Sequence, residues 1–191
     1  DLNSLIAGGV DTGEVDIVKV GDPRRIADVR FVITLDSDTQ LPRDAARRMV
    51  ETLAHPLNTA VLTKQGEVTE GTYTIIQPRV STSLPSATQT PFSRLFTDPV
   101  GIDPYTRAVS DAYMDLAGEA SYHGKGIYDP RVFDKLLRGR FPEQWLLSHD
   151  LIEGAHVGVG LASDIELFDE FPPDYLTFTR RQHRWIRGDW Q

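Results

Sequence analysis

The chain has 191 residues, a formal net charge of −8 and a pI near 5.1, which indicates a single domain and excludes a nucleic-acid partner, because such partners need a basic face. It contains no cysteine, so a disulfide framework is excluded. No apolar run approaches the roughly 20 residues of a bilayer span and no signal-peptide pattern opens the chain, so we expect this segment itself to be soluble.

The first clear element is a strand followed by an acidic turn. "VRFVITL" (Val29–Leu35) is rich in β-branched residues and is typical of a buried strand in a parallel sheet, with Asp36 at its C-terminal end. Pro42 is expected to open a helix with apolar residues at 3.6-residue spacing, which ends at His55-Pro56. The order strand, acidic turn, helix begins an α/β pattern.

The middle of the chain adds a strand, a loop and two helices. "TYTIIQP" (Thr72–Pro78) predicts the strand, and the proline, serine and threonine of Ser83–Pro91 predict the loop. Asp103-Pro104 and Asp129-Pro130 each have the pattern of an N-cap followed by a first-turn proline. The two helices are expected to end near Gly118 and Gly139.

The last two elements complete the pattern. "LASDIELF" (Leu161–Phe168) alternates apolar and acidic residues as a half-exposed strand does, and "DYLTFTRRQHRWIRGDW" predicts a basic C-terminal helix. Strands interleaved with helices predict an α/β layered domain, in which ligands bind at the carboxyl ends of strands.

The most informative turn is "DSD". In extended backbone, residues i and i+2 point the same way, so Asp36 and Asp38 are expected to converge and to share a divalent cation. Hard carboxylate oxygens suit Mg²⁺ or Mn²⁺, which usually take their remaining ligands from water and a substrate diphosphate. The alternative is an Asx-turn in which Asp38 or Thr39 bonds the backbone and both acids are solvated.

Two further segments have both a functional and a structural interpretation. Asp150 in "LLSHDLIEG" follows Ser148, a possible N-cap, so this acid complements a helix dipole or does chemistry. In "SYHGKGIYD", Gly124 and Gly126 flank Lys125, which suits close approach of the backbone to a ligand or a tight turn.

"RRQHRW" (Arg180–Trp185) is a basic and aromatic cluster. Arg181 and Arg184 lie on adjacent turns of one helical face, where guanidinium groups can bind a diphosphate and the indole can stack on a sugar. A solvated helix face is the structural alternative. The histidines of the second half of the chain lack the i, i+4 pairing of a zinc-binding helix. We therefore assign no zinc site to His123, His149, His156 or His183.

Taken in order, "DSD", "HGKG", "SHD" and Arg181-x-x-Arg184-Trp185 resemble the signature of processive inverting glycosyltransferases with the nucleotide-sugar-binding GT-A fold. Longer stretches, among them "VITLDSDTQLPRDAARRMVETLAHPLN", "IIQPRVSTSLPSA" and "RRQHRWIRGDWQ", resemble the glycosyltransferase segment of bacterial cyclic β-1,2-glucan synthases. The resemblance covers nearly the whole chain. It implies UDP-glucose as donor and a growing β-1,2-glucan as acceptor.

The resemblance also implies roles for single residues. Asp36 and Asp38 would bind the donor and its metal, and Asp150 would be the base that takes the proton of the attacking hydroxyl. Arg181 and Arg184 would bind the donor. The acceptor would contact His123, Gly124, Lys125, Gly126 and Trp185. The motif begins here with arginine where cellulose synthases have glutamine.

The family carries an upstream strand and an aspartate for the nucleoside that "DLNSLIAGG" does not match, so residues 1–191 are expected to be an N-terminally truncated GT-A-like domain, inactive when isolated. The resemblance places this fragment in a large membrane-embedded enzyme, at the cytoplasmic face of the bacterial inner membrane.

Two other classes share the acidic turn. In a haloacid-dehalogenase-type phosphohydrolase, Asp36 would be the nucleophile and Asp38 the acid, but that class expects threonine or valine where Gln40 stands. A calcium-binding loop needs glycine at its sixth position, where this chain has Leu41. The phosphohydrolase remains the alternative.

Overall fold

The computed structural model describes residues 3, 6, 26, 28–97, 112–141 and 147–190. Its centre is a four-stranded sheet in the order β1-β3-β2-β4. The strands are β1 (Val32–Thr34), β2 (Ile75–Thr82), β3 (Gly126–Tyr128) and β4 (Val159–Asp169). β3 is antiparallel to both of its neighbours, whereas β2 and β4 are parallel. The expected α/β class is confirmed, but β1 does not pair in parallel as its composition had suggested.

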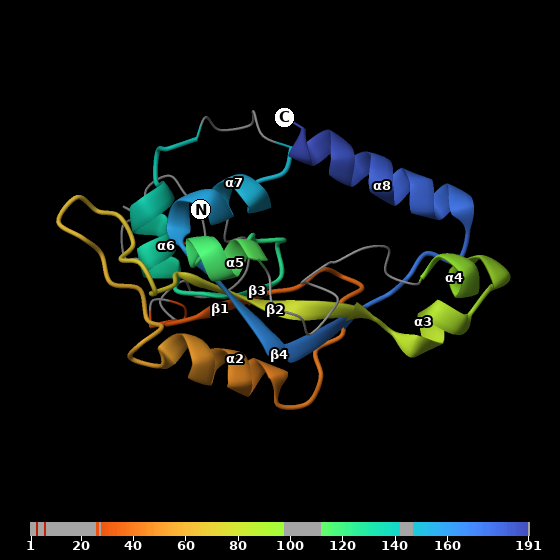
Figure 1. Cartoon of the computed structure of the whole chain (residues 1–191), viewed down its shortest axis with the longest axis horizontal. Coiled ribbons are helices and arrows are strands. Elements are labelled where there is room, and N and C mark those ends of the chain that lie inside the picture. Colours follow the sequence, from red (N-terminus) through yellow and green to blue (C-terminus); the bar gives the residue numbers. More distant parts are fainter. Residues whose placement is uncertain are drawn as a thin grey trace.

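Helices cover both faces of this sheet (Figure 1). One face carries α2, and the other carries α6 and α7. Helix α8 lies further along, beyond the helices that cover the sheet. The described helices are α2 (Ala45–Ala54), α3 (Leu84–Thr88), α4 (Pro91–Phe96), α5 (Ala112–Ala117), α6 (Pro130–Leu137), α7 (Asp150–Val157) and α8 (Tyr175–Asp189).

Two apolar clusters attach these helices to the sheet. On one face, Met49 and Leu53 of α2 pack with Ile76, Ile127 and other buried sheet residues. On the other face, the cluster joins side chains of α6 and α7 to the sheet through Ile75, Tyr122, Tyr128, Phe133, Leu136, Val157 and Val159. Full burial of such a side chain contributes about 1.5–3 kcal/mol, so each helix is held firmly to its face.

Helix boundaries follow local chemistry where a cap is present. Asp129 caps α6 by accepting hydrogen bonds from the amides of Arg131 and Val132, as the Asp-Pro pattern predicted, and Gly139 (φ 72°) follows its end. Gly118 (φ 71°) ends α5 as expected. The start predicted at Asp103-Pro104 lies outside the described residues.

The strands predicted at Val29–Leu35 and Thr72–Pro78 are present with shifted bounds, and three predictions about helices are wrong. α2 begins at Ala45 and not at Pro42, whose carbonyl instead accepts a turn hydrogen bond from the Ala45 amide. The predicted loop Ser83–Pro91 contains α3 and the first residue of α4, because Thr90 and Ser93 form a reciprocal capping box around Pro91.

The third error concerns α7. Its N-cap is His149, with no side-chain capping bond, and not Ser148. The helix is instead held to the body of the protein by its second half, where Gly154 and Val157 are buried. The strand predicted at Leu161–Phe168 and the C-terminal helix are confirmed as β4 and α8. Among the described residues, no helix combines the length and apolarity that crossing a bilayer requires.

The strand directions bring several segments to one edge of the sheet. Because β3 runs opposite to its neighbours, its N-terminal end lies beside the C-terminal end of β1 and near the start of β2, and the parallel strands β2 and β4 continue past it in the same direction. Thr34 of β1 pairs with Gly126 of β3 at this edge. Residues 36–38, 121–125 and 169 therefore meet there although they are far apart in the chain.

Candidate functional site

A cleft of about 460 Å³ opens at this edge of the sheet. Four segments form it: the turn after β1, the residues before β3, the start of α7 and the C-terminal half of α8. Its lining residues are Asp36, Ser37, Asp38, Tyr122, His123, Lys125, Leu147, Ser148, Asp150, Leu151, Arg184, Trp185, Gly188 and Asp189. Most residues predicted from the sequence motifs are thus in one place.

The acidic turn is held by backbone bonds to its own residues and to β4. The Thr39 amide donates to the Asp36 carbonyl at 3.1 Å, and the Gln40 amide donates to the Phe168 carbonyl at 2.7 Å. Asp36 and Asp38 both line the cleft, but they do so from a turn and not from the extended backbone that the i, i+2 argument assumed, since Ser37 between them lines the cleft as well. Thr39 does not form the alternative backbone turn with its side chain, because its hydroxyl donates to Asp169 Oδ1 at 2.6 Å.

Lys125 is the cation at the centre of this edge. Its Nζ lies 2.8 Å from Asp36 Oδ2 and 3.1 Å from Asp169 Oδ2, and the side chain is 9% exposed. Burial alone would lower the pKa of Lys125, but the hydrogen bond to Asp36 and the charges of Asp169 and Asp36 outweigh burial and raise it. The ammonium therefore stays charged and fixes both carboxylates.

The two glycines beside Lys125 each allow the close approach of a different neighbour. Gly124 (φ +80°) lies against the base candidate: a Cβ there would be 2.7 Å from Asp150 Oδ2. Gly126 (φ +151°) lies within β3, where a Cβ would be 2.4 Å from the Ile76 carbonyl oxygen. Gly126 is therefore placed in the sheet, and neither glycine lines the cleft, whereas His123 and Lys125 do.

Asp150 is positioned by the packing of α7. Gly154 lets the helix approach so closely that a Cβ would be 2.8 Å from Tyr122 Cβ, and the Tyr122 hydroxyl is 2.8 Å from Thr34 Oγ1. Burial raises the pKa of the Asp150 carboxyl, and the charge of Asp36 raises it further, while Lys125 opposes the rise. A carboxylate with a raised pKa at a cleft wall is a stronger base than a solvated one.

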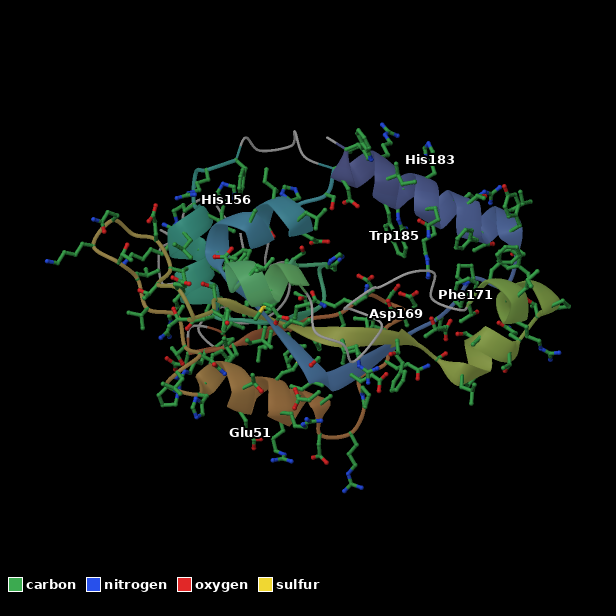
Figure 2. The ribbon with its side chains drawn as sticks, in the orientation of Figure 1. Glu51, His156, Asp169, Phe171, His183 and Trp185 are labelled. Carbon is green, nitrogen blue, oxygen red and sulfur yellow. The ribbon has the colours of Figure 1, made fainter. Side chains whose placement is uncertain are left out.

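α8 closes the cleft from the opposite side. Figure 2 shows Trp185 on the side of α8 that faces the sheet and His183 on the opposite side. The Arg181 guanidinium lies 4.7 Å from the centre of the Trp185 ring, donates to the Glu170 carbonyl at 2.9 Å and is 3.4 Å from Asp38 Oδ2. Arg181 thus reaches the acidic turn, and Arg184 lines the cleft one turn further along.

The carboxylate oxygens of Asp36 and Asp38 suit a divalent cation that takes its remaining ligands from water or from a bound phosphate. Asp36 and Asp38 present hard oxygen ligands to the cleft, and the Lys125 ammonium already occupies a cation position on Asp36. Among the described residues, no group of three histidine or acidic side chains is arranged to hold a metal. Mg²⁺ often uses one or two carboxylates together with phosphates and water, and Asp36 and Asp38 offer oxygens of that type.

Sequence motifs missed three residues of the site. Asp169 pairs with Lys125, and Tyr122 and Asp189 line the cleft. Asp169 directly follows the predicted strand Leu161–Phe168 and is the last residue of β4, so the rule that ligands gather at carboxyl ends of strands would have identified it. Tyr122 and Asp189 carry no local signal, because only tertiary packing brings them to the cleft.

Comparison with known proteins gives one informative similarity. No family model matches the chain. The chain is similar to the cyclic beta-(1,2)-glucan synthase NdvB of Rhizobium meliloti (strain 1021). The two are 43% identical over 195 residues, which include all of this chain and 7% of the relative. The chain thus spans a small part of that protein's length, and the similarity supports the resemblance drawn from the motifs.

Proposed function

We propose that this chain is the catalytic segment of an inverting glycosyltransferase that adds glucose from UDP-glucose to a growing β-1,2-glucan. The observation that carries the proposal is the position of Asp150, which shares one cleft with Asp36, Asp38 and the indole of Trp185. Similarity to a cyclic glucan synthase along the whole chain supports the same reaction class. The cleft contains a base, an acidic pair and cationic side chains, which are the groups that this reaction needs.

The reaction would be a single in-line displacement. A hydroxyl of the acceptor attacks the anomeric carbon of glucose while its proton passes to the Asp150 carboxylate. The bond from that carbon to the UDP oxygen breaks, and its electron pair leaves with the diphosphate. Inversion needs one base and no enzyme nucleophile, and general-base assistance typically contributes about 10²–10⁴ in rate.

The remaining side chains would bind and orient the two substrates. Arg184 and Arg181 carry guanidinium groups suited to a diphosphate, and Trp185 offers an aromatic face to a sugar ring. Gly124 leaves room for the Asp150 carboxylate itself, and His123 and Lys125 would border the acceptor. When bound at Asp36 and Asp38, Mg²⁺ or Mn²⁺ would neutralise charge on the departing diphosphate.

The proposal extends to the protein that contains this segment. We infer a larger membrane-embedded enzyme in which residues 1–191 form part of a GT-A-like domain facing the cytoplasm. The phosphohydrolase alternative gains no support, because the similarity is to a glucan synthase.

Substitution of Asp38 by alanine tests the donor side of the site. In the full-length protein, Asp38→Ala should weaken metal-dependent binding of UDP-glucose by about tenfold or more, because one of two metal ligands is lost. Asp164→Ala is the matched control, since Asp164 is an exposed acid that pairs with Arg48 at 2.6 Å far from the cleft. Calorimetric titration in which both variants bind UDP-glucose like wild type would reject the proposed donor site.

A further inference from the structure

A buried lysine shared by two acids is unusual in a site that must admit a second cation. Lys125 Nζ contacts Asp36 and Asp169 at 2.8 and 3.1 Å, while the other oxygen of Asp169 accepts the Thr39 hydroxyl. Asp169 is 19% exposed in its side chain and Asp36 is 51% exposed. The ammonium therefore joins a fixed, inner carboxylate to an accessible one at the cleft.

The position of Lys125 has a direct electrostatic consequence for a divalent ion. An ion bound to Asp36 would lie within a few ångströms of a positive charge that water screens poorly, so the lysine opposes it. Asp38 is likewise approached by the Arg181 guanidinium at 3.4 Å. In the absence of substrate, both acids of the turn thus have a protein cation beside them.

We propose that Lys125 is a positioning residue that makes metal binding at Asp36 conditional on the nucleotide. Without nucleotide the ammonium holds Asp36 and disfavours the metal; a bound diphosphate adds negative charge and ligands that overcome this opposition. The inference rests on the proposed function, because it takes a nucleotide-diphosphate and a divalent cation as the ligands of the cleft.

Asp169 makes the exchange feasible. When the metal takes Asp36, the ammonium keeps an ion pair with Asp169, so no buried charge is left unpaired. Asp169 stays in place through the Thr39 hydroxyl and its position at the end of β4. The two acids therefore have separate functions: Asp36 alternates between lysine and metal, and Asp169 retains the lysine.

The test measures Mn²⁺ binding to the full-length protein by electron paramagnetic resonance, with and without UDP. An Asp36→Asn/Asp38→Asn double variant defines binding at all other sites. Lys125→Met removes the charge but keeps an unbranched side chain, and Lys64→Met is the matched control because Lys64 is exposed. Asp169→Asn is the second variant, since asparagine still offers an oxygen to Thr39.

The two variants should move metal affinity in opposite directions. Lys125→Met should raise the Mn²⁺ affinity of the nucleotide-free protein at least about tenfold and reduce the gain that UDP produces. Asp169→Asn should lower that affinity about threefold or more, because the ammonium then has Asp36 alone. Lys64→Met should match wild type. If Lys125→Met does not fold, the inference is judged by the Mn²⁺ affinity of Asp169→Asn, which must be lower than that of wild type.

Two results would overturn different claims. If wild type has a UDP-dependent Mn²⁺ site that the double variant lacks, but Lys125→Met binds Mn²⁺ like wild type, the inference about Lys125 is wrong and the proposed function stands. If wild type and the double variant bind Mn²⁺ equally with UDP present, the metal site of the proposed function is itself wrong.

Discussion

Replacing Gly124 with alanine perturbs Asp150 through one added methyl group. The new Cβ would lie 2.7 Å from Asp150 Oδ2 and 3.1 Å from its Cγ. Ordinary contacts begin near 3.4 Å, so the carboxylate must move by roughly 0.7 Å, and a displacement of about 1 Å can cost 10²-fold in rate. We expect turnover to fall about 10- to 100-fold while UDP-glucose affinity changes little.

The backbone conformation supplies a matched control for this substitution. Gly124 has φ +80°, and alanine in the left-handed region costs roughly 1–2 kcal/mol irrespective of its neighbours. Gly71 has φ +77° with nothing within 4 Å of an added Cβ, so Gly71→Ala carries the same strain without the contact. Any difference between the two variants is therefore due to Asp150.

The assay is transfer of labelled glucose from UDP-glucose into glucan by the full-length protein, with UDP-glucose titrated separately. Gly124→Ala should be slow with near-normal donor binding, and Gly71→Ala should be close to wild type in both. Equal turnover of the two variants would refute the claim that Gly124 protects the position of the base.

Two other substitutions test the contact of α8 with the cleft and the burial of an acid in α7. Gly188→Ala should lower UDP-glucose affinity about three- to tenfold in the same titration, because its Cβ would be 2.8 Å from Ser148 Cβ and would push α8 outward, whereas exposed Ile186→Ala should not. Burial and the charge of Asp150 raise the pKa of Glu153 to about 7, so the stability that its neutral form contributes is present below pH 4.5 and lost as pH rises through 7. Glu153→Gln should therefore gain up to about 3 kcal/mol over wild type at pH 8 and little at pH 4.5 in denaturant unfolding, and an equal gain at both pH values would contradict this.

Elements with their own capping chemistry were predictable from the sequence. Asp129-Pro130 specifies both the cap and the first turn of α6 within two residues, and no distant contact is needed. The same pattern at Thr90-Pro91 starts α4, but the surrounding prolines and serines favoured a loop. The parallel pairing expected for β1 failed because β composition reports burial and does not identify the partner strand.

The candidate site likewise combines features that the sequence predicts with contacts that only the tertiary structure shows. The acidic turn was correctly expected at the cleft, although its backbone is not extended as the spacing argument assumed, and the helical spacing of Arg181 and Arg184 predicted that they lie on one side of α8. Spacing does not show that Lys125 joins Asp36 to Asp169, since that contact depends on the antiparallel position of β3. The family resemblance assigned Gly126 to the acceptor, but the structure places it against the backbone of β2.

The most direct test of the proposed catalytic role is replacement of Asp150 by asparagine in the full-length protein. Asparagine keeps the size of the side chain but cannot take the proton of the attacking hydroxyl, so glucose incorporation should fall roughly 10²-fold or more. UDP-glucose binding should stay close to wild type, because Asp36, Asp38 and Arg184 remain. Asp164→Asn, which alters an exposed acid, should change neither quantity. An Asp150→Asn protein that transfers glucose at near wild-type rate would contradict the assignment of Asp150 as the base.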